Sequence, residues 1–210
     1  MINKDKLINI DSGMDMAVQQ AGKIYFEGGV FIYPTDTIYG FGANPFNEDS
    51  IKRVNKIKSR ESGKLFILLI KDIETLLKYV DLKSERHMDF LISIWPNPVS
   101  VILNLNSKTK NILNNDTAAF RVPNNRFCLK LLSEIKMPLI STSVNRKDEP
   151  PLLDSGQISN EFSSEVDAIF YSDKKSYCDS STLIDLSKSE LKLVREGKFK
   201  FEELLAKYEH

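Results

Sequence analysis

The chain has 210 residues, of which 41% are hydrophobic and 28% are charged, as in ordinary globular domains. Its 29 basic residues balance its 29 acidic residues, so no net charge attracts nucleic acid or a membrane surface to the molecule as a whole. Residues 65–70 form the longest apolar run, which is far shorter than the roughly 20 residues that cross a bilayer. The N-terminus lacks the apolar core of a secretory signal. We therefore expect a cytoplasmic protein with no membrane segment.

The spacing of apolar residues predicts alternating helices and strands along the chain. Ser12 precedes apolar residues at helical spacing, and Gly28-Gly29 stops this first helix, because glycine takes the left-handed conformation that follows a helix. In chain order, we then expect a strand over 30–33, a polar loop over 35–42, a helix from Asn47 through Ile57, a strand buried on both faces over 65–70, helices over 72–79 and 84–94, strands over 99–103 and 118–122, a helix over 126–135, a strand over 139–142, a helix over 155–163, strands over 167–171, 182–186 and 191–195, and a helix over 200–208.

Short connections between mixed elements predict one α/β domain over residues 1–210, built on a twisted, largely mixed sheet flanked by helices. Its core spans 12–197, and the helix at 200–208 follows. Cys128 and Cys178 lie far apart and have no metal-ligand spacing, so we expect each to be a small buried hydrophobe.

The segment YPTDTIYGFG, residues 33–42, follows a predicted buried strand. It combines hydroxyl side chains, a carboxylate and two glycines, and loops at strand ends commonly carry ligand groups in α/β sheets. Taken alone, the segment is also compatible with an ordinary polar turn.

Two further segments have short polar or cationic side chains. KSRESGK, residues 58–64, carries three cations that suit phosphate oxygens, although a solvated helix end has the same composition. STSVN, residues 141–145, directly follows a predicted strand and fits either a small ligand or a serine-rich turn.

Two arginines stand at predicted strand ends. Arg121 and Arg195 each follow apolar residues, where a guanidinium needs a carboxylate or phosphate partner, so each fits either a structural ion pair or a bound anion.

The two histidines, His87 and His210, have no placed partners, which gives a Ser-His-Asp hydrolase little support. The lysine, arginine, serine, threonine and asparagine side chains of these segments suit a site that binds and orients phosphates.

The order of these segments is more specific than any one of them. The succession YPTDTIYGFG, KIKSR, IWPNPVS, AAFRVP, ISTSVN, SSTLID and LVREG resembles the threonylcarbamoyl-AMP synthase family, also called YrdC-like or TsaC-like. The match runs from about Val30 to Gly197, and the chain resembles the short, single-domain form of the family.

The resemblance implies an activity and a fold. Family members condense L-threonine, bicarbonate and ATP into threonylcarbamoyl-AMP and pyrophosphate, with Mg²⁺ accompanying ATP rather than held by a dedicated protein site. Downstream proteins then transfer the threonylcarbamoyl group to adenosine 37 of tRNA. The implied fold has a basic concave cavity that could also bind RNA.

The resemblance also implies roles for single residues. The set expected at L-threonine comprises Thr35, Arg121, Ser141 and Ser181. The set expected at ATP comprises Lys58, Arg60, Ser62, Thr117, Ser143, Asn145 and Arg195, with Lys58 and Arg60 acting on the reacting phosphates.

The sequence departs from the family pattern at several positions. Glu61 and Leu65 stand where prolines are usual, Leu69 where a histidine is common, Asn97 where glycine is usual, and residues 146–148 where Leu-Ser-Gly is usual. Three alternatives stay open from sequence: a non-catalytic paralogue that binds double-stranded RNA or nucleotide, a carbamoyl-adenylate-forming relative, and an interaction protein without a ligand.

Overall fold

The computed structural model describes residues 6–59, 66–82, 84–174 and 179–209, which contain strands and helices in alternation. The strands are β1 (Leu7–Asn9), β2 (Phe31–Tyr33), β3 (Gly40–Gly42), β4 (Ile67–Leu69), β5 (Val99–Asn104), β6 (Thr117–Arg121), β7 (Leu139–Ser143), β8 (Ala168–Tyr171), β9 (Thr182–Asp185) and β10 (Lys192–Arg195). The helices are α1 (Met14–Phe26), α2 (Glu48–Ile57), α3 (Ile73–Leu76), α4 (Glu85–Ile94), α5 (Ser107–Leu113), α6 (Arg126–Ile135), α7 (Ser155–Phe162) and α8 (Phe201–Glu209).

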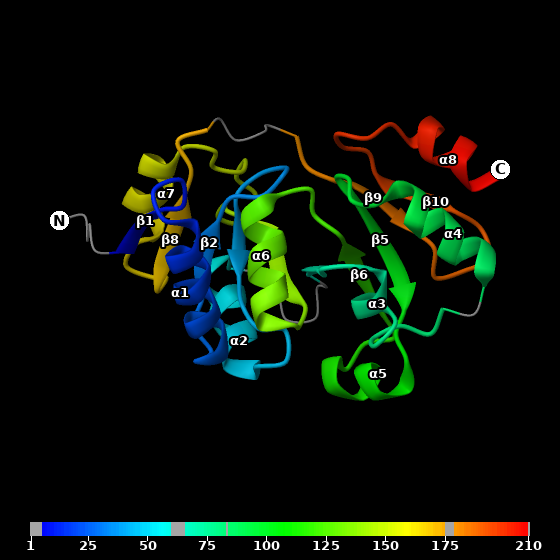
Figure 1. The fold of residues 1–210 in the computed structure, drawn as a ribbon, viewed down its shortest axis with the longest axis horizontal. Coiled ribbons are helices and arrows are strands. Elements are labelled where there is room, and N and C mark those ends of the chain that lie inside the picture. The colour runs from blue at the N-terminus through cyan, green and yellow to red at the C-terminus, as the bar shows by residue number, and fades with distance from the viewer. Residues whose placement is uncertain (1–5, 60–65, 83, 175–178, 210) are drawn as a thin grey trace.

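All of these strands join one sheet in the order β1-β8-β2-β3-β7-β4-β6-β5-β9-β10. The pairs β1–β8, β8–β2, β4–β6 and β5–β9 are parallel, and the other pairs are antiparallel. Figure 1 shows β1, β8 and β2 at one end of the molecule and β5, β9 and β10 at the other. The mixed α/β sheet expected from sequence is therefore confirmed.

Helices cover both faces of the central strands, which explains why these strands are apolar throughout. In β2, Phe31 and Tyr33 belong to one buried cluster, with side chains of α1 and α6, whereas Ile32 between them belongs to another. The second cluster includes side chains of α2, α4, α7 and α8. Strands with two covered faces lose the usual alternation of apolar and polar residues.

Local signals in the sequence set several helix ends. The Asn47 side chain accepts a hydrogen bond from the Ser50 backbone N–H at 2.9 Å, and Asn125 accepts one from Cys128 at 3.0 Å, so both asparagines are N-caps. After α1, Gly28 has a φ of +77°, a conformation that favours glycine. The predicted helix at 126–135 has the bounds of α6.

Three elements were not predicted. β3 lies within the segment expected to be a polar loop, where it pairs with β2 and β7. β1 pairs only with β8 at the sheet edge, and α5 starts from an Asn106 cap in a polar segment. The helix expected over 72–79 is also shorter, since α3 ends at Leu76.

Several residues singled out from the sequence are not among those that the structure describes. Arg60, Glu61, Ser62, Leu65, Cys178 and His210 lie outside the described residues. Cys128 is a buried free thiol, and burial raises its pKa, as expected for a small core residue. No helix in the described ranges combines the length and the apolarity needed to span a membrane.

Candidate functional site

A cavity of about 250 Å³ lies over the sheet face that also carries the α1 and α6 core. Ile67 belongs to both, because it lines the cavity and packs against that core. Strands β7 and β4 contribute the aligned residues Ser141 and Ile67 to its floor, and β6 contributes Arg121. The lining residues are Thr37, Ile38, Tyr39, Phe66, Ile67, Arg121, Ser141, Thr142, Ser143, Ser180, Ser181, Leu183 and Arg195.

Arg121 enters the cavity from the C-terminal end of β6 and is almost completely buried. Its Nη1 donates to the Thr37 hydroxyl at 3.0 Å, and its Nη2 lies 3.6 Å from a carboxylate oxygen of Asp36. Asp36 is 6% exposed and Arg121 is 3% exposed. The structure therefore contains the ion pair that was one of the two expectations for Arg121.

The polar contacts of this pair are incomplete. Among the described residues, both carboxylate oxygens of Asp36 and the Nε of Arg121 are buried without a hydrogen bond. Buried polar groups are normally paired, so such groups mark a place where a ligand or water can complete the network. Arg121 thus retains donor capacity beside the cavity.

Thr35 lies behind Thr37 in the same network. The Thr35 hydroxyl donates to the carbonyl of Ile38 at 2.8 Å and accepts from the Thr37 backbone N–H at 3.0 Å. Its remaining lone pair faces the Thr37 hydroxyl at 2.9 Å, so the hydroxyl of Thr35 has no capacity left. Thr37 lines the cavity and Thr35 does not. Contact between Thr35 and a ligand would require this network to rearrange.

Lys58 joins the end of α2 to the loop after β7. Its ammonium donates to the Ser143 carbonyl at 2.5 Å and to the Asn145 side-chain oxygen at 2.8 Å, and it lies 5.6 Å from the centre of the Phe41 ring. The Ser143 hydroxyl donates to the same Asn145 oxygen at 2.6 Å. Three residues expected at ATP are therefore assembled into one cluster, of which Ser143 lines the cavity.

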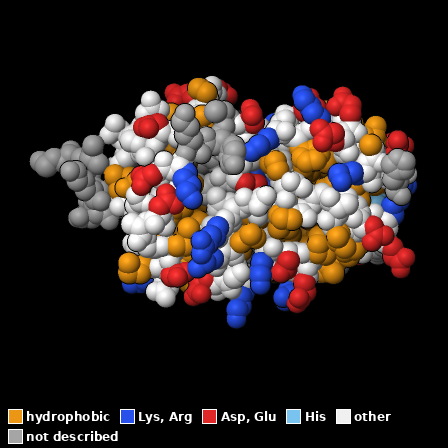
Figure 2. All heavy atoms as spheres, turned by 45° about the horizontal axis from the view of Figure 1, so that its top comes forward, with side chains coloured by type: hydrophobic (Ala, Val, Ile, Leu, Met, Phe, Trp, Pro, Cys, Tyr) orange, Lys and Arg blue, Asp and Glu red, His pale blue; other side chains and the backbone are white. Residues whose placement is uncertain are grey.

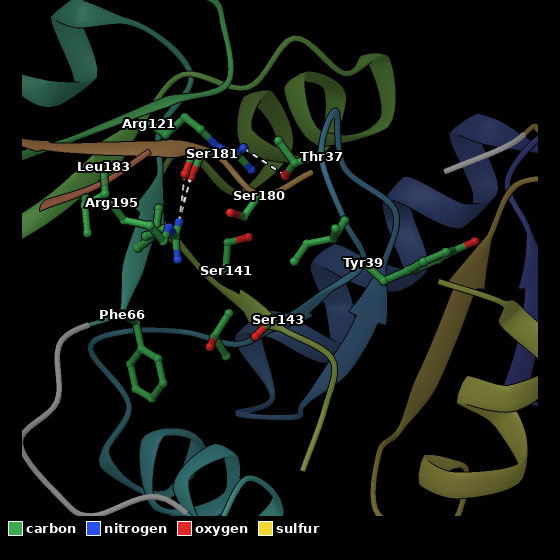
Figure 3. Close-up of a pocket in the computed structure, with 13 residues that line it drawn as sticks. Thr37, Tyr39, Phe66, Arg121, Ser141, Ser143, Ser180, Ser181, Leu183 and Arg195 are labelled. Carbon is green, nitrogen blue, oxygen red and sulfur yellow. Dashed lines mark hydrogen bonds between the residues drawn. The ribbon is translucent and has the colours of Figure 1, made fainter. Parts of the chain in front are cut away.

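Arg195 reaches the opposite side of the cavity from β10. Its Nη2 donates to the Ser181 carbonyl at 2.9 Å and to the Ser181 hydroxyl at 3.3 Å (Figure 3). The Ser181 hydroxyl in turn lies 2.9 Å from the Ser100 hydroxyl. The pairing of β10 with β9 shifts register between Leu193 and Arg195. Such an irregularity re-aims the side chain that follows it.

Two cationic side chains line the described part of the cavity. Arg121 and Arg195 are the charged members of its described lining, which holds no carboxylate. Desolvation and then the charge of Arg121 lower the pKa of Arg195, and an anion bound between the two guanidinium groups would oppose this shift. Outside the cavity, Figure 2 shows basic and acidic side chains interspersed over the face in view.

Other expected positions lie away from the cavity lining. Thr117 stands at the start of β6, on the strand face of Arg121, but does not line the cavity. Leu69, one of the departures from the family pattern, is fully buried in the α1 and α6 core. His87 contacts the Tyr208 hydroxyl at 3.2 Å, between α4 and α8.

Sequence reasoning missed residues that complete the site. Asp36 and Thr37 stood inside the motif that was singled out, but only Thr35 was selected from it. Ser180 precedes Ser181 and also lines the cavity. The alternation of strand residues could not identify these three, because they lie in loops.

The departure at residues 146–148 builds a structural contact. Arg146 donates to Glu161 at 2.9 Å, to Glu165 at 2.5 Å and to the Ile57 carbonyl at 2.9 Å. Its guanidinium also lies 4.3 Å from the centre of the Phe162 ring. Arg146 thereby ties the loop that contains Asn145 to α2 and α7, and its hydrogen bonds to Glu165 raise its pKa.

We expect Arg146→Ala to lower the free energy of unfolding by about 2 kcal/mol, because it removes the cation from two carboxylates and an aromatic ring. Lys147→Ala, at the exposed neighbouring position, is the control and should change stability by less than about 0.5 kcal/mol. Urea denaturation measures both variants. Equal effects of the two substitutions would contradict this role for Arg146.

Comparisons with known proteins agree with this fold. The model of the Sua5_yciO_yrdC family, described as "Telomere recombination", matches residues 23–197. The structure of P. abyssi Sua5 complexed with L-threonine is 25% identical, with a TM-score of 0.87, and the alignment covers 96% of this chain but 60% of that one. This chain thus spans about three fifths of the length of that protein.

Two more distant structures show the same fold. E. coli YciO is 24% identical with a TM-score of 0.84, and 94% of this chain aligns with 97% of it. T. kodakarensis HypF is 16% identical with a TM-score of 0.74, and 86% of this chain aligns with 24% of it. The family model covers most of the sequence, from the end of α1 to Gly197. The chain therefore belongs to the Sua5/YciO/YrdC family.

Proposed function

We propose that the chain is an L-threonylcarbamoyladenylate synthase, a nucleotidyltransferase that forms threonylcarbamoyl-AMP and pyrophosphate from L-threonine, bicarbonate and ATP. The observation that carries the proposal is the placement of Arg121 and Arg195 in one cavity lined by hydroxyl groups. A substrate with a carboxylate at one end and phosphates at the other requires two separated cationic groups of this kind. Membership of the family and its Sua5 relative that binds L-threonine support the same activity.

In this proposal the threonine carboxylate binds Arg121, whose planar guanidinium can donate two parallel hydrogen bonds. Ser141 and Ser181 contact the rest of the amino acid from the cavity floor, and Thr35 acts through Thr37 unless its network opens.

The nucleotide lies toward Lys58 and Arg195. Lys58, Ser143 and Asn145 form the assembled part of this ATP subsite, while Arg60, Ser62 and Thr117 belong to it by resemblance.

The reaction needs charge stabilisation rather than a protein nucleophile. The threonine amine and bicarbonate form a carbamate with loss of water. A carbamate oxygen then attacks the α-phosphorus, and the bond from that phosphorus to the pyrophosphate oxygen breaks. Lysine and arginine side chains stabilise the negative charge that leaves with pyrophosphate. In this proposal Mg²⁺ arrives with ATP, and no group of three His, Cys, Asp or Glu residues in the described ranges could hold a metal ion.

The proposed product is an activated intermediate for the modification of adenosine 37 in tRNA. Cytoplasmic transfer proteins would consume it, and the cavity could also contact RNA. The main alternative is a non-catalytic paralogue that binds RNA or nucleotide.

The test is pyrophosphate release from ATP with Mg²⁺ and bicarbonate, with and without L-threonine. Threonine-dependent release, with labelled threonylcarbamoyl-adenylate as the product, is the expected result. Binding of ATP or RNA without any release would contradict the proposed enzyme and favour the paralogue.

A further inference from the structure

Thr182, at the start of β9, lies between Ser181 and Leu183, which line the cavity, but its own side chain does not line it. Thr182 is fully buried, and its hydroxyl accepts from the backbone N–H groups of Gly197 at 3.0 Å and Phe199 at 3.1 Å. The same hydroxyl donates to the carbonyl of Phe199. A hydroxyl has one donor and two acceptor sites, so all three serve the segment that follows Arg195.

That segment lies directly against the cavity wall. The backbone N–H of Lys198 donates to the Ser180 carbonyl at 2.9 Å. A Cβ added at Gly197 would lie 2.2 Å from the Ser180 oxygen, so the approach is possible only without a side chain. Residues 197–199 are therefore fastened along Ser180 to Thr182, and two of those residues, Ser180 and Ser181, line the cavity.

Packing does little to place the preceding strand. All four residues of β10 are exposed, and β10 forms an edge of the sheet. Within the described part of the chain, Arg195 forms no ion pair, and its polar contacts are those to Ser181 (Figure 3). The Arg195 backbone is held on one side by the irregular pairing of β10 with β9, where Arg195 lies opposite Leu183, and on the other side by the segment that follows it.

We propose that Thr182 is a positioning residue that fixes Arg195 in the cavity by fastening residues 197–199 to the start of β9. This inference rests on the proposed function, in which Arg195 binds the nucleotide. The hydroxyl, not the methyl group, carries the role. Thr182→Ser therefore keeps the hydrogen bonds to Gly197 and Phe199, whereas the isosteric Thr182→Val removes them.

The first arm of the test measures the KM for ATP. We expect Thr182→Val to raise it about tenfold, the effect of losing roughly 1.4 kcal/mol of binding, with kcat changed by less than about threefold and near-normal values in Thr182→Ser. In an Arg195→Ala background, Thr182→Val should have no further effect on the KM. An equal tenfold effect in both backgrounds would show that Thr182 has only a structural role and would overturn the proposal.

The second arm does not depend on activity. Amide hydrogen exchange should show faster exchange at Gly197, Lys198 and Phe199 in Thr182→Val, with unchanged exchange in β2 and β6, and normal protection in Thr182→Ser. Unchanged protection in the valine variant would overturn the fastening itself. If wild-type protein releases no pyrophosphate while the valine variant loses this protection, the proposed function fails and the fastening stands.

Discussion

Replacing Arg121 by methionine should lower the free energy of unfolding by about 3–5 kcal/mol, because it leaves the buried Asp36 carboxylate without its cation. The same variant should lose threonine-dependent pyrophosphate release. The double variant Asp36→Asn/Arg121→Met should recover most of the stability, since the uncompensated charge is gone, but none of the activity. Urea denaturation and the release assay separate the two effects.

Arg121→Lys separates charge from geometry. Lysine keeps a cation near Asp36 but cannot offer two parallel donors to a carboxylate. We expect the KM for threonine to rise by about tenfold or more while the KM for ATP changes little. Arg126→Lys, at an exposed position on α6, is the matched control. An unchanged KM for threonine in Arg121→Lys would contradict the assignment of the carboxylate to this residue.

Lys58→Met should reduce pyrophosphate release about a hundredfold or more, the usual cost of removing one preorganised charged donor from a transition state. Methionine retains most of the buried aliphatic volume but cannot donate hydrogen bonds to the Ser143 carbonyl and the Asn145 side-chain oxygen. The cluster expected at ATP would therefore lose both its charge and its shape.

The control for this prediction is Lys56→Met, an exposed lysine in the last turn of the same helix, which should retain full activity. Activity of Lys58→Met within twofold of the wild type would refute the role of Lys58. A thermal melt of each variant shows whether the loss comes from unfolding.

Elements with local signals were predictable from the sequence. The Asn47 and Asn125 caps and the apolar stripes behind them defined α2 and α6, because both signals lie within a few residues of the helix. β1 and β3 have three residues each, and their existence depends on partners distant in the sequence. No local pattern in Leu7–Asn9 or Gly40–Gly42 could reveal those partners.

The site was predictable in its segments and not in its contacts. Five of the seven motifs contribute residues that line the cavity, KIKSR contributes Lys58, and IWPNPVS reaches the site only through the hydrogen bond between Ser100 and Ser181. Thr37 lines the cavity in place of the expected Thr35 because of one turn in the loop after β2, and side-chain chemistry does not specify that turn. The buried partner of Arg121 follows from the same turn.

The order of the strands in the sheet has a consequence for how the protein becomes functional during synthesis. The cavity takes Thr37 from near the start of the chain, Arg121 from its middle and Arg195 from near its end, all on one sheet face. Contacts this distant in sequence form late, because the loops between them must close first. A nascent chain that has folded β2, β6 and β7 on the ribosome would hold Arg121 against Asp36 but would lack Arg195 in the cavity until β10 emerged.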